Sequence, residues 1–236
     1  MKTLVMMPTY NEIETLERSV SELFRHNPSV ELLIIDDNSP DGTGALAQSL
    51  ADSEPRAHVL HRGGKEGLGK AYLAGMTWGL ASGYELFVQM DADGSHRAQD
   101  LPKLLKMAKS DGLVIGSRWI SGGAVRNWPW YRMMISRGGN LYAAAMLGSK
   151  LGDLTAGFRV YGRSLLLELP LSDVAAHGYG FQVEMTKNVL ELRRPVIEVP
   201  IEFVERENGT SKMTLAIVIE ALLLATKWGI ARLIRR

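Results

Sequence analysis

The sequence predicts an α/β fold in which a mostly parallel sheet is flanked by helices on both faces. Through the first half of the chain, short apolar runs alternate with longer segments of helical character. Four of the five runs are followed at once by Gly, Asp or Pro, which is typical of strands buried on both faces. A strand–helix–strand order needs crossover connections, and such connections make the strands parallel.

The predicted strands of the first half are residues 3–7, 31–35, 57–60, 85–90 and 112–115. Between them the sequence predicts helices at residues 12–24, 42–51, 68–81 and 98–109. Asp41 and Asp100 lie at the starts of two of these helices, where a carboxylate caps or stabilises the first turn. Open α/β sheets bind ligands beyond the carboxyl ends of their strands, so functional residues are expected there.

The second half of the chain is less regular. Residues 121–130, rich in Gly and Trp, predict an irregular loop that is neither strand nor helix. The further expected elements are a helix at 132–147, a strand near 157–161, a helix near 181–192, a strand at 196–204, a polar turn at 205–212 and a long closing helix. No repeat or low-complexity linker divides the 236 residues. We therefore expect one domain, with residues 1–212 as its body and residues 213–236 as its closing helix.

Composition excludes several classes of function. With 27 basic and 26 acidic residues, the formal charge of +1 argues against a nucleic-acid partner. The absence of cysteine excludes disulfide scaffolds, Cys-ligated zinc, iron–sulfur clusters and thiol catalysis. The apolar N-terminal stretch, cut by Pro8, is too short for a signal peptide, and no stretch reaches the roughly 18 to 20 apolar residues of a membrane span.

Acidic and polar residues cluster directly after three of the predicted strands. Asp91 and Asp93 follow the fourth strand with one residue between them, and their like charges repel each other. A divalent cation relieves this repulsion, and Mg²⁺ is typically held by one or two carboxylates together with substrate phosphates. The pair therefore favours a metal-bound nucleotide over turn-forming acids, whereas for Asp41 and Asp100 capping is an equal explanation.

Three blocks at the strand ends, taken in chain order, carry a family resemblance. They are Thr9-Tyr10-Asn11-Glu12, residues 36–43 and Asp91-Ala92-Asp93. This combination resembles the inverting family-2 glycosyltransferases of the GT-A fold. Further blocks at residues 135–140, 153–159, 178–185 and 206–212 are similar to the dolichol- or polyprenol-phosphate mannosyltransferases.

The resemblance implies transfer of mannose from GDP-mannose to the phosphate of a dolichyl or other polyprenyl monophosphate, with inversion and release of GDP. It implies a divalent cation, Mg²⁺ or Mn²⁺, as cofactor. The implied metal ligands are Asp91, Asp93 and, more weakly, Ser95. For His96 we expect a turn or supporting role rather than metal ligation. The implied catalytic residues are Asp91, Asp93 and Arg118.

The same resemblance implies residues for the donor and the acceptor. The implied donor-binding residues are Pro8, Tyr10, Glu12, Ile35, Asp37, Asp91, Ala92, Asp93, Arg206 and Lys212. The implied ligands of the acceptor phosphate are Arg118, Arg132 and Ser136. Arginine suits phosphate through its planar fork and lysine as a point charge. Arg137 and Arg159 are expected instead to hold the fold together through Asp153 or Glu184.

The implied acceptor also limits the chemistry that is needed. A phosphate is already an oxyanion at neutral pH, so it needs little or no help from a general base. Catalysis can then consist of alignment and electrostatic stabilisation. We therefore expect no Ser or Cys nucleophile and no catalytic His.

The closing helix offers contact with a membrane surface. Its apolar positions are nearly continuous, Glu220 and Lys227 lie on one narrow stripe, and Arg232, Arg235 and Arg236 gather at its end. A helix in the membrane interface is the working hypothesis. Core packing and, with less support, a membrane span stay open. A second lipid-facing surface, explained equally well by core packing, is formed by Tyr131, Met133, Met134, Tyr142 and Met146.

We expect a cytoplasmic protein that is peripheral on the cytoplasmic face of the membrane, and a membrane-protein partner stays open. One rival function is transfer from UDP-glucose or another nucleotide sugar to the same kind of lipid. Many proteins of that kind carry added C-terminal spans, and the absence of spans here favours the mannosyl type. The other rival is a silent GT-A-like membrane adaptor, which would not need both the acids Asp91 and Asp93 and the cations Arg118 and Arg206.

Overall fold

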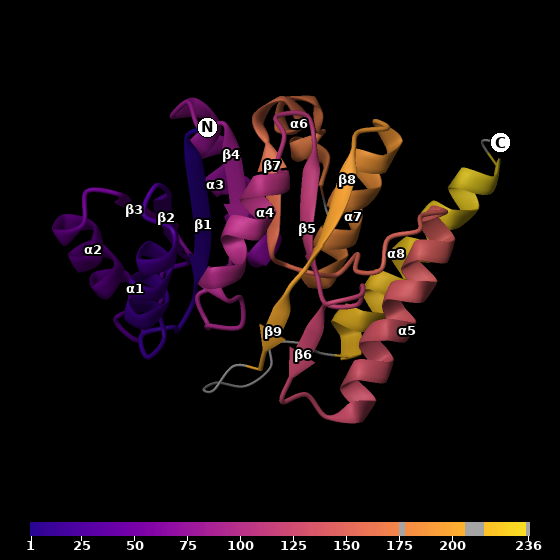
Figure 1. Cartoon of the computed structure of the whole chain (residues 1–236), viewed down its shortest axis with the longest axis horizontal. Helices are drawn as coiled ribbons and strands as arrows, with labels where there is room; N and C mark the ends of the chain where they lie inside the picture. Colours follow the sequence, from indigo (N-terminus) through magenta and orange to yellow (C-terminus); the bar gives the residue numbers. More distant parts are fainter. Residues whose placement is uncertain (175–177, 206–214, 235–236) are drawn as a thin grey trace.

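A seven-stranded sheet forms the centre of the computed structural model, which describes residues 1–174, 178–205 and 215–234 (Figure 1). Its strands in chain order are β1 (Thr3–Thr9), β2 (Glu31–Asp36), β3 (Ala57–His61), β4 (Leu86–Gln89), β5 (Leu113–Ser117), β7 (Arg159–Gly162) and β8 (Val196–Pro200). Their spatial order is β3-β2-β1-β4-β7-β5-β8. Within this sheet β7 runs antiparallel to both of its neighbours, and the other pairings are parallel. The predicted mostly parallel sheet is confirmed.

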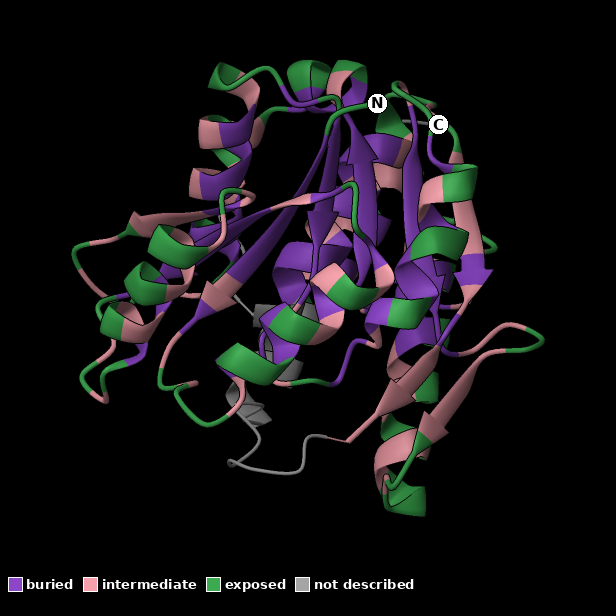
Figure 2. Ribbon diagram, turned by 60° about the vertical axis from the view of Figure 1, so that its left-hand side comes forward, coloured by how far each residue is buried: buried purple, intermediate pink, exposed green. Residues whose placement is uncertain are grey.

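Both faces of the sheet are covered because successive side chains of a strand point to opposite sides. In β1, Val5 and Met7 join one core, whereas Leu4 and Met6 join the other. Around the first core lie α1 (Leu16–His26), α2 (Thr43–Ser53), η1 (Ala98–Asp100) and α4 (Leu101–Met107). Around the second lie α3 (Leu68–Ala81), α6 (Arg163–Glu168) and α7 (Gly178–Glu191), with η2 (Leu171–Asp173) after α6. Figure 2 shows the buried strands enclosed by these helices.

Two glycines of α3 allow this helix to lie close to the sheet. A Cβ atom built at Gly75 would lie 2.6 Å from Ile35 Cδ1, and one at Gly79 would lie 2.6 Å from Phe87 Cε1. A larger residue at either position would push the helix away from the strands. The close contact keeps Tyr72, on the same helix, within hydrogen-bonding distance of residues that follow β4.

Two further helices, α5 (Trp130–Leu147) and α8 (Leu215–Ile234), lie side by side at one end of the molecule (Figure 1). They enclose a small third core with α7, and its buried members are Ala143, Ala144, Leu154, Val183 and Ala225. The predicted long closing helix is confirmed between Leu215 and Ile234. One side of α8 packs on the protein, so part of the core-packing interpretation holds.

Several boundaries differ from the sequence-based expectation. The helix α1 begins at Leu16 rather than residue 12, because Asn11 adopts a left-handed backbone and the Glu12 N–H donates to the Thr43 hydroxyl. The expectation of an irregular segment at 121–130 is wrong for β6 (Ala124–Arg126), which pairs in parallel with β9 (Glu202–Val204). The strand expected at 196–204 is two strands, β8 and β9. The first belongs to the large sheet and the second to this small one.

Candidate active site

The site lies along one edge of the sheet, where β1, β2, β4 and β5 all end, since these four strands run in the same direction. The segments that follow them are residues 10–12, 37–43, 90–96 and 118–119, and they carry most of the predicted site residues. The structure therefore brings these predicted residues to one edge of the sheet, as the strand-end rule expects. Of the predicted residues, Arg206 and Lys212 lie outside the described residues.

Asp91, the first acid of the predicted metal pair, is held from two sides. The hydroxyl of Tyr72, a fully buried residue of α3, donates to Asp91 Oδ1 at 3.0 Å. The backbone N–H of Asp91 donates to His96 Nδ1 at 3.0 Å. Because Nδ1 accepts this bond it carries no proton, so His96 is neutral in this arrangement. The 3.9 Å separation of His96 Nδ1 from Asp91 Oδ2 is therefore not an ion pair.

The imidazole of His96 is buried between aromatic rings. It stacks on Phe158 with ring centroids 5.0 Å apart and meets the edge of Phe203 at 5.8 Å. These contacts fix the ring that receives the Asp91 N–H. They match the supporting role expected for His96.

Asp93 and Ser95 form a tight turn. Asp93 Oδ1 accepts the Ser95 N–H at 3.0 Å, and Gly94 between them has a φ of 76°, which favours glycine. The Ser95 hydroxyl is buried and has no hydrogen-bond partner among the described residues. Buried hydroxyls normally have partners, so this orphaned oxygen fits a further ligand at the turn.

The donor set at this turn fits a cation that is shared with a substrate. No group of three or more His, Cys, Asp or Glu residues is arranged to hold a metal within the described ranges. Asp91 and Asp93 are both partly exposed, and their carboxylates are the hard oxygen donors that such a cation takes. Mg²⁺ and similar cations are commonly bound by such a pair, with substrate phosphates and waters completing the shell.

Beside the predicted donor residues Tyr10 and Asp37 lie two basic residues that the sequence analysis missed. Lys65 Nζ lies 4.2 Å from the centroid of the Tyr10 ring, and Arg62 forms an ion pair with Asp37. Burial raises the pKa of Asp37 above its ordinary value, although the charge of Arg62 acts in the opposite direction. The available signal was the pair Gly63-Gly64 between the two basic residues, directly after β3.

Three further predicted donor residues lie at the ends of β1 and β4. Pro8 belongs to β1, and Glu12 and Ala92 lie in the loops that follow β1 and β4. Pro8 is half-buried in register with Ile35, and Glu12 is fixed by the Thr15 hydroxyl, which donates to Glu12 Oε2 at 3.1 Å. Ala92 is buried, and its carbonyl accepts the Ser19 hydroxyl at 2.8 Å. These contacts tie the loops after β1 and β4 to α1.

Ile35 differs from the expectation of direct donor contact. Its side chain is fully buried in the core that packs against α3. Its carbonyl oxygen receives the Thr9 hydroxyl at 3.4 Å. Ile35 therefore packs in the core below the end of β2, and its side chain does not face the site.

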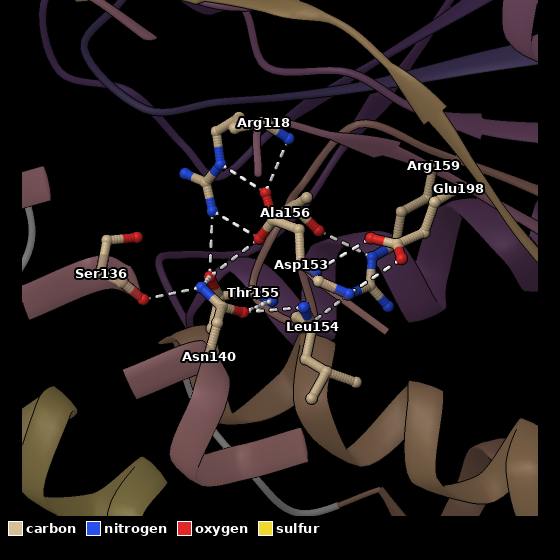
Figure 3. Close-up of polar contacts among 10 residues, drawn as sticks. Arg118, Ser136, Asn140, Asp153, Leu154, Thr155, Ala156, Arg159 and Glu198 are labelled. Atoms are coloured by element: carbon tan, nitrogen blue, oxygen red, sulfur yellow. Dashed lines mark hydrogen bonds and ion pairs between the residues drawn. The ribbon is translucent and has the colours of Figure 1, made fainter. Parts of the chain in front are cut away.

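Arg118, which follows β5, is part of a buried ion pair (Figure 3). Its Nε donates to Asp153 Oδ2 at 2.7 Å and one Nη donates to Asp153 Oδ1 at 2.8 Å. The Arg118 side chain is 5% exposed and that of Asp153 is fully buried. The same Nη also reaches the Thr155 hydroxyl at 3.0 Å. The fork of Arg118 therefore holds the 153–155 loop through Asp153 and Thr155, and its contact with the acceptor phosphate stays a prediction.

A second buried arginine, Arg159, binds main-chain carbonyls rather than a carboxylate. It donates to the carbonyls of Leu154 at 2.6 Å, Ala156 at 2.7 Å and Gln182 at 2.9 Å. The expectation that Asp153 pairs with Arg137 or Arg159 is therefore wrong, since Asp153 pairs with Arg118. Arg159 still holds the fold together, as expected, by joining the 154–156 loop to α7.

One face of α5 connects the remaining acceptor residues to this network. Arg132, Ser136 and Asn140 are spaced four residues apart and share that face. Asn140 accepts the backbone N–H groups of Leu154 at 2.7 Å and Thr155 at 3.1 Å, and donates to the Ser136 carbonyl at 2.9 Å (Figure 3).

Aromatic rings surround the three arginines of this region. The Arg132 guanidinium lies 4.0 Å from the Trp128 ring, and that of Arg137 lies 5.0 Å from the Trp119 ring. Arg118 lies 5.6 Å from each of these two rings. The structure therefore brings Arg118 and Arg132 into contact with one tryptophan-rich cluster.

A cavity of about 260 Å³ lies between α1 and the turn of Asp93. Its lining includes Asp93, Gly94 and His96 on one side and Arg18 of α1 on the other. Glu205, directly after β9, also lines it. Glu205 forms an ion pair with Arg132, so this cavity adjoins the arginine and tryptophan cluster.

Comparison with known proteins identifies relatives of the whole chain. The family model described as glycosyl transferase family 2 matches residues 4–169. An undecaprenyl-phosphate mannosyltransferase of Micrococcus luteus is 49% identical over 231 residues, which is 98% of this chain and 95% of that protein. A polyprenol monophosphomannose synthase of Mycolicibacterium smegmatis is 48% identical, over 97% of this chain and 87% of that protein.

Solved structures share the fold at low sequence identity. The mannosyltransferase PcManGT of Pyrobaculum calidifontis, in complex with GDP-Man and Mn²⁺, aligns with a TM-score of 0.58 at 17% identity, over 99% of this chain and 74% of that one. GalNAc-T7 with UDP, GalNAc and Mn²⁺ aligns with a TM-score of 0.62 at 14% identity, over 96% of this chain and 47% of that one.

Proposed function

The chain belongs to glycosyl transferase family 2 and is a glycosyltransferase, and from this premise we propose that it transfers mannose from GDP-mannose to the phosphate of a polyprenyl or dolichyl monophosphate. The products are a polyprenyl phosphate β-mannose and GDP. One observation carries the proposal: in a chain that matches such relatives over nearly its whole length, two neighbouring acids, Asp91 and Asp93, follow β4 and a cluster of arginine and tryptophan follows β5 at the same edge. The acids after β4 are suited to bind a nucleoside diphosphate through a cation, and the arginines after β5 are suited to bind a second phosphate.

On the donor side, Asp91 and Asp93 would hold a divalent cation, Mg²⁺ or Mn²⁺, with Ser95 as a further oxygen ligand. When bound, the cation stabilises the charge that develops on the departing GDP. Tyr72 keeps Asp91 in one rotamer by its hydrogen bond to Oδ1. Tyr10, Glu12 and Asp37 would contact the guanosine. Arg206 and Lys212 are proposed to contact the diphosphate.

On the acceptor side, Arg132 and Ser136 would bind the phosphate from one face of α5. Arg118 positions the 153–155 loop beside them through Asp153. The bound phosphate oxygen can attack the anomeric carbon directly, because it is already ionised at neutral pH. A single displacement from the face opposite to GDP inverts the anomeric configuration.

We propose further that the lipid acceptor is reached from the surface of a membrane. In α5, Trp130 is 74% exposed and Leu141 is 75% exposed, and in α8, Leu223 is 65% exposed. The sequence of α5 holds no acidic residue, and three exposed cations lie on or just after these helices, namely Arg137, Lys150 and Lys227. An apolar face with a cationic rim complements an anionic bilayer.

The position of α8 supports treating residues 213–236 as part of the same domain as residues 1–212. Ala225 is buried against α5 and α7, and Gly229 approaches Met146 of α5 closely. None of the helices in the described residues is both long and apolar enough to cross a membrane. We propose a peripheral position on the cytoplasmic face, where α5 and α8 rest on the lipid.

The test is a transfer assay with competing donors. Purified protein is incubated with a polyprenyl phosphate and with radiolabelled GDP-mannose, UDP-glucose or UDP-GlcNAc, and label in the lipid phase is counted. We expect label from GDP-mannose in the presence of Mg²⁺ or Mn²⁺ and background counts from the UDP-sugars. Transfer from a UDP-sugar in place of GDP-mannose would contradict the proposed donor.

A further inference from the structure

Arg132 lies in the first turn of α5, and a neighbouring carboxylate neutralises its charge. Its Nη1 forms an ion pair with Glu205, and the two side chains are 16% and 23% exposed. The guanidinium plane lies 4.0 Å from the Trp128 ring. Arg132 is thus partly desolvated, flanked by an aromatic face on one side and neutralised by Glu205.

Two donors beside this ion pair have no acceptor. Arg132 Nε and Trp128 Nε1 are both buried, and neither finds a hydrogen-bond partner in the described part of the chain. Trp119 Nε1, in the same aromatic cluster, is also buried and has no hydrogen-bond partner among the described residues. Buried donors are normally satisfied, so the cluster offers more hydrogen bonds than Glu205 accepts.

Glu205 stands between the acceptor residues and the predicted metal site. It follows β9 directly, and its N–H donates to the Arg126 carbonyl at 3.2 Å, which fixes its backbone on the small sheet. Its side chain pairs with Arg132, and Glu205 also lines the cavity that Asp93 lines. An anion bound at Arg132 in place of the Glu205 carboxylate would therefore lie next to the cavity that Asp93 lines.

We propose that Glu205 is a placeholder for the acceptor phosphate: its carboxylate neutralises Arg132 until a phosphate monoester takes its place. This inference rests on the proposed function. A phosphate monoester carries a charge of about −1.5 to −2 near pH 7 and has three strong acceptor oxygens, whereas the carboxylate has a single charge and two oxygens. The phosphate can therefore satisfy the orphaned donors that Glu205 leaves.

The placeholder gives the site a means of choosing among lipid anions. A fatty acid would only replace one carboxylate by another, so it gains little by displacing Glu205. A phosphate gains charge and hydrogen bonds from the same exchange. Glu205 thus acts as a specificity-determining residue that lowers the affinity of every anion but rejects carboxylates in particular.

The test compares Glu205→Gln with Glu202→Gln. Glu202 lies on β9, three residues before Glu205, pairs with Arg126 and Arg97, and is absent from the cavity lining, so its variant removes the same charge at a nearby position. With geranylgeranyl phosphate as acceptor, we expect Glu205→Gln to lower the acceptor KM by about threefold or more and to leave the KM for GDP-mannose unchanged. Glu202→Gln should change neither.

A second measurement separates this role from a structural one. Oleate should inhibit the Glu205→Gln enzyme at several-fold lower concentration than the wild type, because no carboxylate competes with it. If Glu205→Gln does not fold, Glu205→Asp, with a shorter reach to Arg132, should show both effects in the same direction. An unchanged or raised acceptor KM in an active variant overturns the inference alone. A wild-type protein that transfers no mannose to a prenyl phosphate overturns the proposed function as well.

Discussion

A single hydroxyl group orients one of the two acids of the predicted metal site. Tyr72 is fully buried and stacks on Phe181 of α7, so its hydroxyl cannot turn away from Asp91 Oδ1. Burial and the charge of Asp91 raise the pKa of Tyr72 well above its ordinary value. The group therefore stays protonated, and keeps donating, throughout the neutral pH range.

We expect Tyr72→Phe to weaken cation-dependent donor binding without unfolding the protein, since it removes one hydroxyl and no packing volume. The Mn²⁺ concentration for half-maximal binding of GDP, measured by calorimetry, should rise by about three- to tenfold, the equivalent of one typical intramolecular hydrogen bond. Tyr161→Phe is the matched control, because Tyr161 is also fully buried but its hydroxyl serves Arg159. Equal Mn²⁺ dependence in the two variants would contradict the orienting role.

The buried pair of Arg118 and Asp153 makes a prediction about stability rather than about binding. Arg118→Ala leaves the Asp153 charge buried without its partner, which typically costs about 3–5 kcal/mol. We expect the free energy of unfolding, measured in urea, to fall by about 3–5 kcal/mol. Donor binding and acceptor-dependent transfer should fall together, because the whole fold is weakened. Arg132→Ala should instead weaken only the binding of the acceptor and leave stability unchanged, because the Arg132 ion pair is nearer the surface. An Arg118→Ala protein as stable as the wild type would contradict the structural role and favour Arg118 as a phosphate ligand.

At the scale of elements, the close approach of α3 to the sheet makes a second stability prediction. Gly79→Ala would bring a methyl group to 2.6 Å from Phe87 and 2.7 Å from Leu4. We expect a loss of about 1–3 kcal/mol in the free energy of unfolding, as for an overpacked core.

The control for this prediction is Gly139→Ala in α5. A Cβ there would have nothing within 4 Å, so we expect a gain of about 0.5–1 kcal/mol from helix propensity. Both variants are measured by urea denaturation. A Gly79→Ala protein as stable as the wild type would mean that α3 has freedom to move away from the strands.

The elements that the sequence predicted well are those whose signal is local. The strands β1 to β5 are short apolar runs, four of which are followed at once by Gly, Asp or Pro, and Asp91 and Asp93 follow one of them. The strands β6 and β9 are each three residues long and depend on a partner from a distant part of the chain. Their own sequences therefore carried no sufficient signal.

The same distinction explains the candidate site. Residue types and apolar runs predicted that the two acids follow a strand end, but the choice of ion-pair partner depends on tertiary distance. Arg118 pairs with Asp153 and Arg62 pairs with Asp37, because strands β5 and β7 and strands β2 and β3 lie next to each other. Spacing along the chain does not encode these pairings.

For the whole molecule, the exposed apolar face of α5 and α8 predicts membrane binding. We expect Leu223→Glu with Ile230→Glu to reduce sedimentation with anionic vesicles by about tenfold, because it removes apolar contact and adds two negative charges at the lipid surface. These two residues are 65% and 53% exposed, so the fold should be retained.

The control for the vesicle experiment is Leu167→Glu on α6. Leu167 is 64% exposed but lies away from α5 and α8, and its variant should sediment like the wild type. Transfer to a long-chain polyprenyl phosphate in vesicles should fall in the double variant, whereas transfer to a short water-soluble prenyl phosphate should be kept. Undiminished vesicle binding by the double variant would assign the face to a protein partner.

The antiparallel strand β7 also bears on the order in which the chain folds during synthesis. The neighbours of β5 in the sheet are β7 and β8, and both are synthesised after it. Until residues 159–162 have left the ribosome, β4 therefore has an open edge and β5 has no strand beside it. Pairings between distant segments form slowly, and unpaired strand edges favour aggregation. The half of the sheet that carries the acids can thus assemble first, and β7 then joins it to the half that carries the arginines.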